Sequence, residues 1–269
     1  MRPTTPVMHR ASLATDSTML FRRIVLCALL VGALAGSLLS AIQLWQVIPI
    51  IHRAEHFEQA RTSQMTEPAR EVTHGHKDAG HAHPAGEWEP AEGAERMGYT
   101  LLANVLTAIG FALVMLVGMA SSLKLNYVAK LDWRYGLLWG VAGYAIFFVA
   151  PSLGLPPEIP GAATADQQAR QLWWLLAVVC TATGLAVVAF SKIRWRWVAL
   201  GLLVVPYLVG APHLATGPFA DYPPPVAAEL ADLAQQFFWA TALANALYWL
   251  VLGSASAWAV RRFLKEAVT

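Results

Sequence analysis

The chain has 269 residues, of which 57% are hydrophobic and 13% are charged, and its formal net charge is +2. Soluble domains carry about 25% charged residues, so this composition excludes an ordinary soluble protein and indicates an integral membrane protein. The small net charge identifies no partner, because the signal lies in how the charges are distributed along the chain. We expect membrane lipid around this protein, and no nucleic acid.

The N-terminal residues 1–18 are polar and irregular, and we expect a disordered extension there, followed by a single membrane domain over residues 19–269. Met19 directly precedes the first apolar run and is a candidate start of the protein. Arg22 and Arg23 before an apolar run are also typical of a signal peptide. The run is longer than the about 7–15 residues of a signal-peptide core, which favours an uncleaved anchor.

Six stretches are apolar enough to be membrane spans, for which about 20 mostly apolar residues are needed. Backbone polar groups must be paired inside lipid, so the spans are helices or barrel strands, and long unbroken apolar runs exclude the alternating pattern of strands. The fifth stretch is the weakest, because it is short and ends near Pro206 and Pro212. The sequence therefore predicts an all-α membrane protein with spans near residues 24–48, 101–121, 135–153, 172–190, 197–210 and 237–260.

Basic residues gather on one side of these predicted spans. The N-terminal segment, the second and fourth loops and the C-terminal tail hold 13 of the 19 basic residues, with only Asp16, Asp132 and Glu266 among the acids. Loops rich in Lys and Arg stay in the cytoplasm. We therefore expect a protein of the bacterial inner membrane with both termini in the cytoplasm and the loop of residues 52–98 on the external, periplasmic side.

Part of the sequence is repeated. Residues 101–114 and 175–188 match at nine of fourteen positions, and the three outward-running helices each have a proline near the outer end, at Pro49, Pro151 and Pro206. This pattern favours three helical hairpins related by a repeat, as in many transporters. The alternative is chance recurrence of the small residues that membrane helices use at their contacts.

His52 and His56 follow the first span and are one helical turn apart, so a continued helix places them on the same face with Glu55 beside them. Imidazole is the commonest metal ligand and suits cobalt, nickel, zinc and copper. The three side chains could chelate one divalent ion. Alternatively, the imidazoles are surface groups of an interfacial helix.

The external loop of residues 52–98 contains a second histidine group, which consists of His74, His76, His81 and His83. Glycine and alanine residues among them predict a flexible loop in the absence of metal. Such a loop would bind metal weakly and exchangeably, which suits capture of an ion. A solvated loop with incidental histidines is the alternative.

His213 follows the fifth span and is a further candidate ligand, although a lone interfacial histidine is more often structural. Inside the spans no charged residue lies at a helix centre, which argues against a proton relay. Asn104 and Asn245 could line a pathway or bond across helices. Pro151 and Pro206 free backbone carbonyls, which could coordinate a passing cation or be satisfied by neighbouring helices.

The sequence contains several longer motifs, which are residues 19–26, the His-rich loop, and residues 88–96, 99–104, 136–143, 150–161 and 170–174. These motifs resemble those of a known family, the proposed cobalt transporter subunit CbtA of bacteria, over essentially Met19 to the C-terminus. The resemblance implies cobalt uptake linked to cobalamin biosynthesis, and a small single-span companion, CbtB, with its own histidine motif. It also implies five spans, against six counted here, and the difference falls on the fifth.

Three function classes remain to be compared. The leading hypothesis is the membrane subunit of a divalent-metal importer, with cobalt favoured over nickel or zinc as the substrate and no organic cofactor. A membrane di-iron oxygenase needs several histidine motifs on cytoplasmic helix ends, whereas only one His-x-x-x-His is present and it is external, so we expect no enzyme. A metal-binding scaffold or sensor that holds a partner subunit is the alternative that the sequence leaves open.

Overall fold

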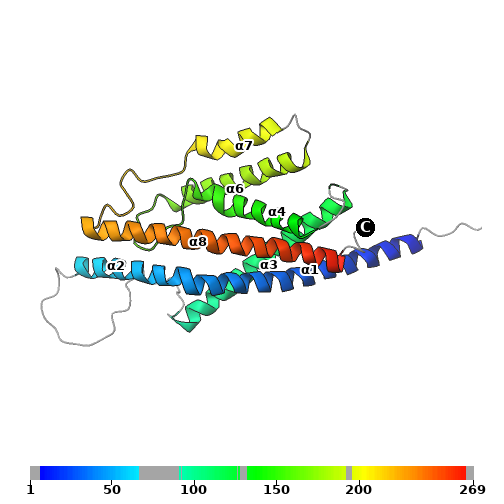
Figure 1. Ribbon diagram of the computed structural model, residues 1–269, viewed down its shortest axis with the longest axis horizontal. Helices are drawn as coiled ribbons and strands as arrows, with labels where there is room; N and C mark the ends of the chain where they lie inside the picture. The colour runs from blue at the N-terminus through cyan, green and yellow to red at the C-terminus, as the bar shows by residue number, and fades with distance from the viewer. Residues whose placement is uncertain are drawn as a thin grey trace, which may run out of the picture.

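The computed structural model describes residues 7–66, 91, 93–125, 127, 132–191 and 196–264, and the regular structure within these ranges is helical (Figure 1). All six apolar segments are helical, which confirms the predicted all-α class. Three short π-helical segments, labelled η, interrupt or end longer helices. The elements are α1 (Val7–Ile42), η1 (Gln43–Val47), α2 (Ile48–Thr66), α3 (Ala94–Lys124), α4 (Trp133–Tyr144), η3 (Ala145–Val149), α5 (Ala150–Ser152), α6 (Gln167–Phe190), α7 (Arg196–Val209), α8 (Pro224–Ala259) and η5 (Val260–Leu264).

The segment expected as the fifth span is shorter than a membrane is thick. Helix α7 has 14 residues and is about 21 Å long at 1.5 Å per residue, against about 30 Å for the hydrocarbon core. It ends at Val209, and the next residue is Gly210, whose φ of +82° favours glycine; Pro212 follows. Within the described part of the chain, five stretches are long and apolar enough to cross a membrane, and they are Thr18–Ser63, Ala94–Lys124, Trp133–Ser152, Gln167–Phe190 and Pro224–Leu264.

Helices α1 and α2 run in one direction along the long axis, and α3, α4, α6, α7 and α8 then alternate in direction (Figure 1). The short helix α7 therefore takes part in the alternation. The start of α1 and the end of α8 lie at the same end of the molecule. There, the Arg23 guanidinium donates a hydrogen bond of 3.3 Å to the carbonyl oxygen of Phe263.

Helix α1 packs against α3 at very short range because two glycines face it. A Cβ atom at Gly32 would lie 2.5 Å from the Cα of Ile109, and one at Gly36 would lie 2.6 Å from the Cα of Val105. The spacing of four residues is the small-residue pattern by which membrane helices approach one another closely. The first predicted hairpin is therefore held together through backbone contact.

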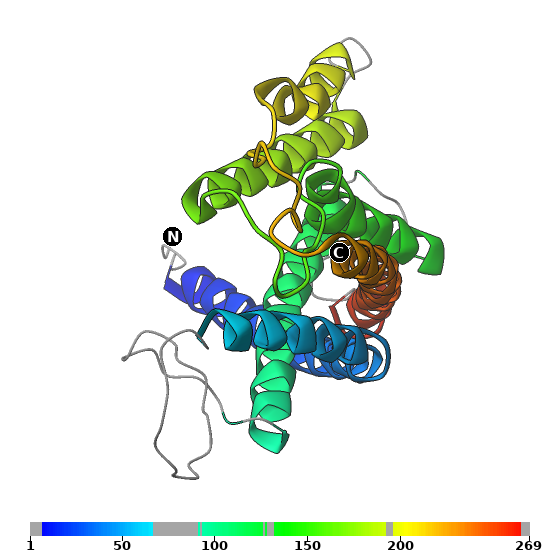
Figure 2. The same cartoon turned by 90° about the vertical axis from the view of Figure 1, so that its left-hand side faces the viewer.

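The remaining helices do not pair in the order of three successive hairpins. Helix α4 packs along α8, and α6 packs along α7. A Cβ atom at Gly140 would lie 2.5 Å from the carbonyl oxygen of Trp249, so the α4 glycines match the surface of α8. Viewed from one end, α6 and α7 lie on one side of the bundle and α1, α3 and α8 on the other, with α4 between them (Figure 2).

A second, smaller hydrophobic cluster forms beyond the main core of α1, α3 and α8. The segments that follow α5 and α7 fold over α2 and the first turns of α8, and the backbone N–H of Ala163 donates to the carbonyl oxygen of Pro218 at 2.8 Å. Ile50 and Ala54 of α2 are buried in this cluster. The cluster holds in place the helical extension that carries His52 and Glu55.

Candidate functional site

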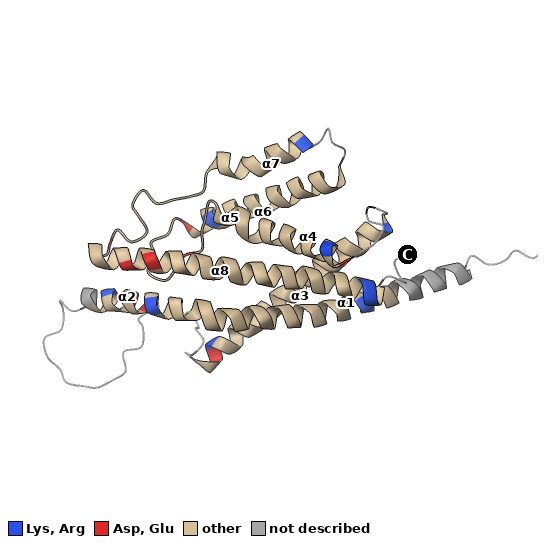
Figure 3. Ribbon diagram, viewed as in Figure 1, with Lys and Arg blue, Asp and Glu red and all other residues tan. Residues whose placement is uncertain are grey.

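The two ends of the bundle differ in charge (Figure 3). Arg22 and Arg23 of α1 lie at the same end of the bundle as Arg261 and Arg262 of η5, where the Arg23 guanidinium contacts Phe263. The opposite end carries His52, His56 and most of the described acidic side chains. Several arginines lie at this acidic end as well, and they are held in ion pairs, which are Arg61 with Asp221, Arg96 with Glu55 and Arg170 with Glu158.

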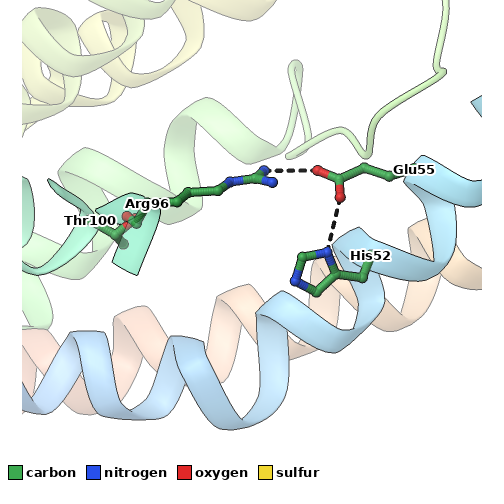
Figure 4. Close-up of polar contacts among 4 residues, drawn as sticks. All are labelled: His52, Glu55, Arg96 and Thr100. Carbon is green, nitrogen blue, oxygen red and sulfur yellow. Dashed lines mark hydrogen bonds and ion pairs between the residues drawn. The ribbon is translucent and has the colours of Figure 1, made fainter. Parts of the chain in front are cut away.

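A three-residue network joins α2 to α3 at the acidic end (Figure 4). His52 and Glu55 lie three residues apart on α2, and the His52 Nδ1 is 3.0 Å from the Glu55 Oε2. The guanidinium of Arg96, near the start of α3, donates to the other carboxylate oxygen of Glu55 at 2.8 Å. The carboxylate thus has a cation on one side and an imidazole on the other, and it neutralises the charge that Arg96 brings to this point.

The third member of the predicted chelating group does not join this network. His56 is exposed on α2, whereas the Glu55 side chain is only 19% exposed. In the part of the chain that the structure describes, no three or more His, Cys, Asp or Glu side chains come together closely enough to hold a metal ion.

A cavity of about 470 Å³ opens between the η1–α2 segment, α3 and α8, next to this network. Its walls come from η1 and α2 on one side, from the first turns of α3 on another and from the middle of α8 on the third. His52 and Arg96 contribute to its outer part. The lining residues are Gln43, Val47, Ile48, Ile51, His52, Gly93, Arg96, Met97, Thr100, Phe237, Thr241 and Ala244.

The inner end of the cavity is polar and lies where α1 changes to the π-helical segment η1. The Asn104 side-chain amide donates to the Oε1 of Gln43 at 2.7 Å and to the Oγ of Ser40 at 3.0 Å. π-Helical turns are rare and often occur at functional sites. Asn104 therefore bonds across helices, one of its two predicted roles, and does so directly behind the cavity.

Asn245, the counterpart of Asn104 in the possible repeat, has a different environment. Its amide donates to the carbonyl oxygen of Thr241, one turn earlier on the same helix, at 3.0 Å. Thr241 lines the cavity, and its own hydroxyl is buried without a hydrogen-bond partner. Buried polar groups without a partner are uncommon and call for an explanation such as bound water or an ion.

The two prolines proposed to free carbonyls lie between α4, α6 and α7, and neither is among the described residues that line the cavity. The indole of Trp173 donates to the carbonyl oxygen of Pro206 at 3.0 Å. The hydroxyl of Tyr207 donates to the carbonyl oxygen of Ala150, the residue before Pro151, at 2.8 Å. The carbonyl that a helix proline frees belongs to the residue four positions earlier, so neither contact occupies a freed carbonyl, and the role of Pro151 and Pro206 stays a prediction.

His213 lies in the segment between α7 and α8, at the acidic end but apart from the described residues of the cavity. The four histidines of the predicted capture loop, His74, His76, His81 and His83, lie outside the described residues. Their part in a site stays a prediction from the sequence.

Sequence analysis did not select three residues of this site: Arg96, Thr100 and Thr241. A signal for them was present, because Arg96, Thr100 and Asn104 recur every fourth residue along α3, as do Thr241 and Asn245 along α8. Residues at this spacing share one helix face. A polar stripe on an otherwise apolar helix indicates a face that is turned away from lipid.

In comparisons of the sequence with protein families, one family matches, described as probable cobalt transporter subunit (CbtA). The match covers residues 21–261 and so includes every residue that lines the cavity. No curated protein and no solved structure matches the chain.

Proposed function

The chain belongs to the CbtA family of probable cobalt transporter subunits, and from this membership we propose that it is the membrane subunit of an importer for divalent cobalt. The metal ion is the substrate of the protein and needs no organic cofactor. The imported cobalt would supply cobalamin biosynthesis, as the family resemblance implies. Nickel and zinc, which imidazole also binds, are the competing ions.

The observation that carries this proposal is the cavity between the η1–α2 segment, α3 and α8. It lies at the end where acidic residues and histidines gather, and its lining runs from His52 at the outer part to Gln43 inside the bundle. An acidic surface raises the local concentration of cations. A cation that reaches this end therefore meets a carboxylate and an imidazole before it meets the apolar core.

We infer a sequence of three steps. The His-rich loop, with His74, His76, His81 and His83, captures the ion weakly on the external side. The ion then passes to His52, Glu55 and His56 on α2, with His213 as a further external contact. From there it enters the cavity and moves between the helices beside Asn104 and Asn245.

The orientation supports import from outside. Loops rich in arginine and lysine stay in the cytoplasm, and the four arginines Arg22, Arg23, Arg261 and Arg262 lie at one end of the bundle. We infer that both termini are cytoplasmic in the inner membrane and that the cavity opens outward. The family description as a subunit leads us to expect a partner, for which a single-span CbtB-like protein is our candidate.

Radiolabelled cobalt uptake tests the proposal, in cells that lack their own cobalt importers. The chain is expressed alone and beside a CbtB-like companion, with nickel and zinc as competing ions. We expect uptake above background, and loss of it in the double variant His52→Ala and His56→Ala. Gln59→Ala is the matched control, because Gln59 is exposed on the same helix. Unchanged uptake in the double variant would contradict the transfer step through α2.

A non-transporting scaffold or sensor is the second candidate, and two observations favour it. The described residues form no cluster of three potential metal ligands, and Asn104 is already bonded to Gln43 and Ser40. Cobalt entry into vesicles reconstituted with the purified chain alone separates the two functions. Entry would exclude the scaffold, and entry only with the companion present would assign the pathway to the pair.

A further inference from the structure

The cavity between the η1–α2 segment, α3 and α8 has mostly apolar walls and a charged outer part. Its volume of about 470 Å³ falls within the range of about 300–1,000 Å³ that is typical of sites for small molecules. Arg96 is the permanently charged side chain among the described lining residues. The apolar side chains of the described lining are Val47, Ile48, Ile51, Met97, Phe237 and Ala244.

The outer part of the cavity lies at the depth of phospholipid headgroups. The apolar stretches of α3 and of the first span begin at residue 101 and end at residue 48. Arg96 precedes the first of these limits by five residues and His52 follows the second by four, which places them about 8 Å and about 6 Å beyond the hydrocarbon at 1.5 Å per residue. The headgroup layer extends about 5–8 Å on each side of the hydrocarbon core. The apolar walls therefore run from the headgroup layer into the hydrocarbon.

The cavity is open on an apolar side at Met97. This side chain lines the cavity and is itself 44% exposed. Leu101, one turn further along α3, is 43% exposed, and the spacing of four residues places both side chains on one face of the helix. An acyl chain that enters from the membrane along this face therefore meets apolar side chains throughout.

The ion pair beside the cavity presents both charges that a zwitterionic headgroup needs. The Arg96 guanidinium donates to the Glu55 carboxylate at 2.8 Å, and both side chains are partly exposed. Guanidinium groups bind phosphate oxygens well, and carboxylates accept hydrogen bonds from ammonium groups. We propose that the cavity binds an ethanolamine phospholipid, with its phosphate at Arg96, its ammonium group at Glu55 and one acyl chain between the helices. This inference goes beyond the proposed function and does not depend on it.

The start of α3 adds to the attraction for a phosphate. Its N-cap residue Gly93 lines the cavity, and no side chain caps the helix there. The first backbone N–H groups of a helix have no partner within it and carry a partial positive charge. The Glu95 carboxylate of the same turn already accepts a hydrogen bond from the backbone N–H of Ala91 at 3.2 Å. One phosphate can thus contact the Arg96 guanidinium close to the positive end of the helix.

A bound lipid would exclude an ion in transit. The acyl chain fills the space between η1, α3 and α8, which leads to Asn104 and its bonds to Gln43 and Ser40. The path that we propose for the ion runs through the same space. The lipid would therefore close the outer end of the bundle until it leaves or its chain moves aside.

Native mass spectrometry of the purified full chain in detergent tests the proposal, with dioleoyl phosphatidylethanolamine as the probe. Dioleoyl phosphatidylcholine, whose ammonium group has no N–H, and dioleoylglycerol, which has the acyl chains but no phosphate, are the comparison lipids. Arg96→Gln removes the guanidinium, and Thr100→Phe places a ring in the cavity. The matched controls are Arg53→Gln and Thr107→Phe, at exposed positions of α2 and α3.

We expect the unmodified chain to retain the ethanolamine lipid, and its dissociation constant to rise about three- to tenfold in Arg96→Gln and in Thr100→Phe. The two control variants should bind like the unmodified chain, and the two comparison lipids should bind more weakly. Equal binding by all variants, or equal binding of the three lipids, overturns the proposal. Absence of cobalt uptake would contradict the proposed function alone, because lipid binding is measured without metal.

Discussion

Glu55 on α2 and Arg96 on α3 form an ion pair across 41 residues of sequence, with 2.8 Å between the Arg96 Nη2 and the Glu55 Oε1. The pair ties the helical extension of the first span to the start of the second at the outer part of the cavity. The same carboxylate contacts His52 through its other oxygen at 3.0 Å. An incoming cation and Arg96 therefore compete for one carboxylate.

Removal of Arg96 is predicted to strengthen cobalt binding. In the variant Arg96→Gln the carboxylate of Glu55 loses its internal counter-ion, so a divalent ion no longer displaces an arginine. The pair is partly exposed and is worth about 0.2–1 kcal/mol, which corresponds to a gain in affinity of about 1.4- to fivefold. Calorimetry with cobalt(II) chloride measures the change.

The control for this variant is Arg53→Gln, which removes the same charge from an exposed position on α2. A general electrostatic effect would strengthen binding equally in both variants. Weaker binding in Arg96→Gln would show that Arg96 only positions Glu55 and does not compete with the metal.

The crossing of α1 and α3 is predicted to depend on Gly32. A Cβ atom there would lie 2.5 Å from the Cα of Ile109, and backbone cannot move aside as a side-chain end can. Gly32→Ala should destabilise the protein by about 1–3 kcal/mol, as overpacking does. The melting temperature in detergent measures the effect.

Gly110 on α3 is the matched control, because nothing lies within 4 Å of a Cβ atom built on it. Gly110→Ala should leave stability unchanged or raise it by up to about 1 kcal/mol through helix propensity. Equal melting temperatures for the two variants would contradict the close approach of α1 and α3.

The two asparagines of the possible repeat are predicted to differ in their contribution to stability. Asn104→Leu removes two hydrogen bonds to another helix and leaves Gln43 unpaired near the cavity. Asn245→Leu removes one bond within its own helix. At about 0.6 kcal/mol for an average bond between membrane helices, and up to about 1.7, we expect the larger loss in free energy of unfolding for Asn104→Leu. Equal losses would mean that the two positions are equivalent, as the repeat suggests.

Opposite ends of the bundle are predicted to face opposite sides of the membrane. Cys27 and Cys180 are free and buried, so a cysteine-free background is obtained by changing both to serine. In that background His213→Cys should react with a membrane-impermeant maleimide in intact cells. Arg262→Cys should react only after the membrane is permeabilised. The reverse pattern would place the cavity on the cytoplasmic side and contradict import from outside.

Composition and local pattern were enough to predict the helices and the separation of charge between the two ends. A long apolar run must be helical in lipid whatever it packs against, because its backbone groups have no other partner. The segments expected near 24–48, 101–121, 172–190 and 237–260 fall inside the helices observed. The shortness of α7 was visible too, in the short apolar run that ends near Pro206 and Pro212.

The neighbours of each helix could not be derived in the same way. Small residues at regular spacing indicate that a helix has a close partner, but they do not say which one. The glycines of α4 therefore left open whether α6 or α8 would be the partner, and the observed contact is with α8.

The sequence by itself determined that this chain is a helical membrane protein, because transfer into lipid depends on each segment's own composition. Only the tertiary structure decided that Arg96 meets Glu55, that Asn104 bonds to Gln43, and that Thr241 faces a cavity. These contacts join residues far apart in the chain, and their geometry follows from how closely the helices can approach.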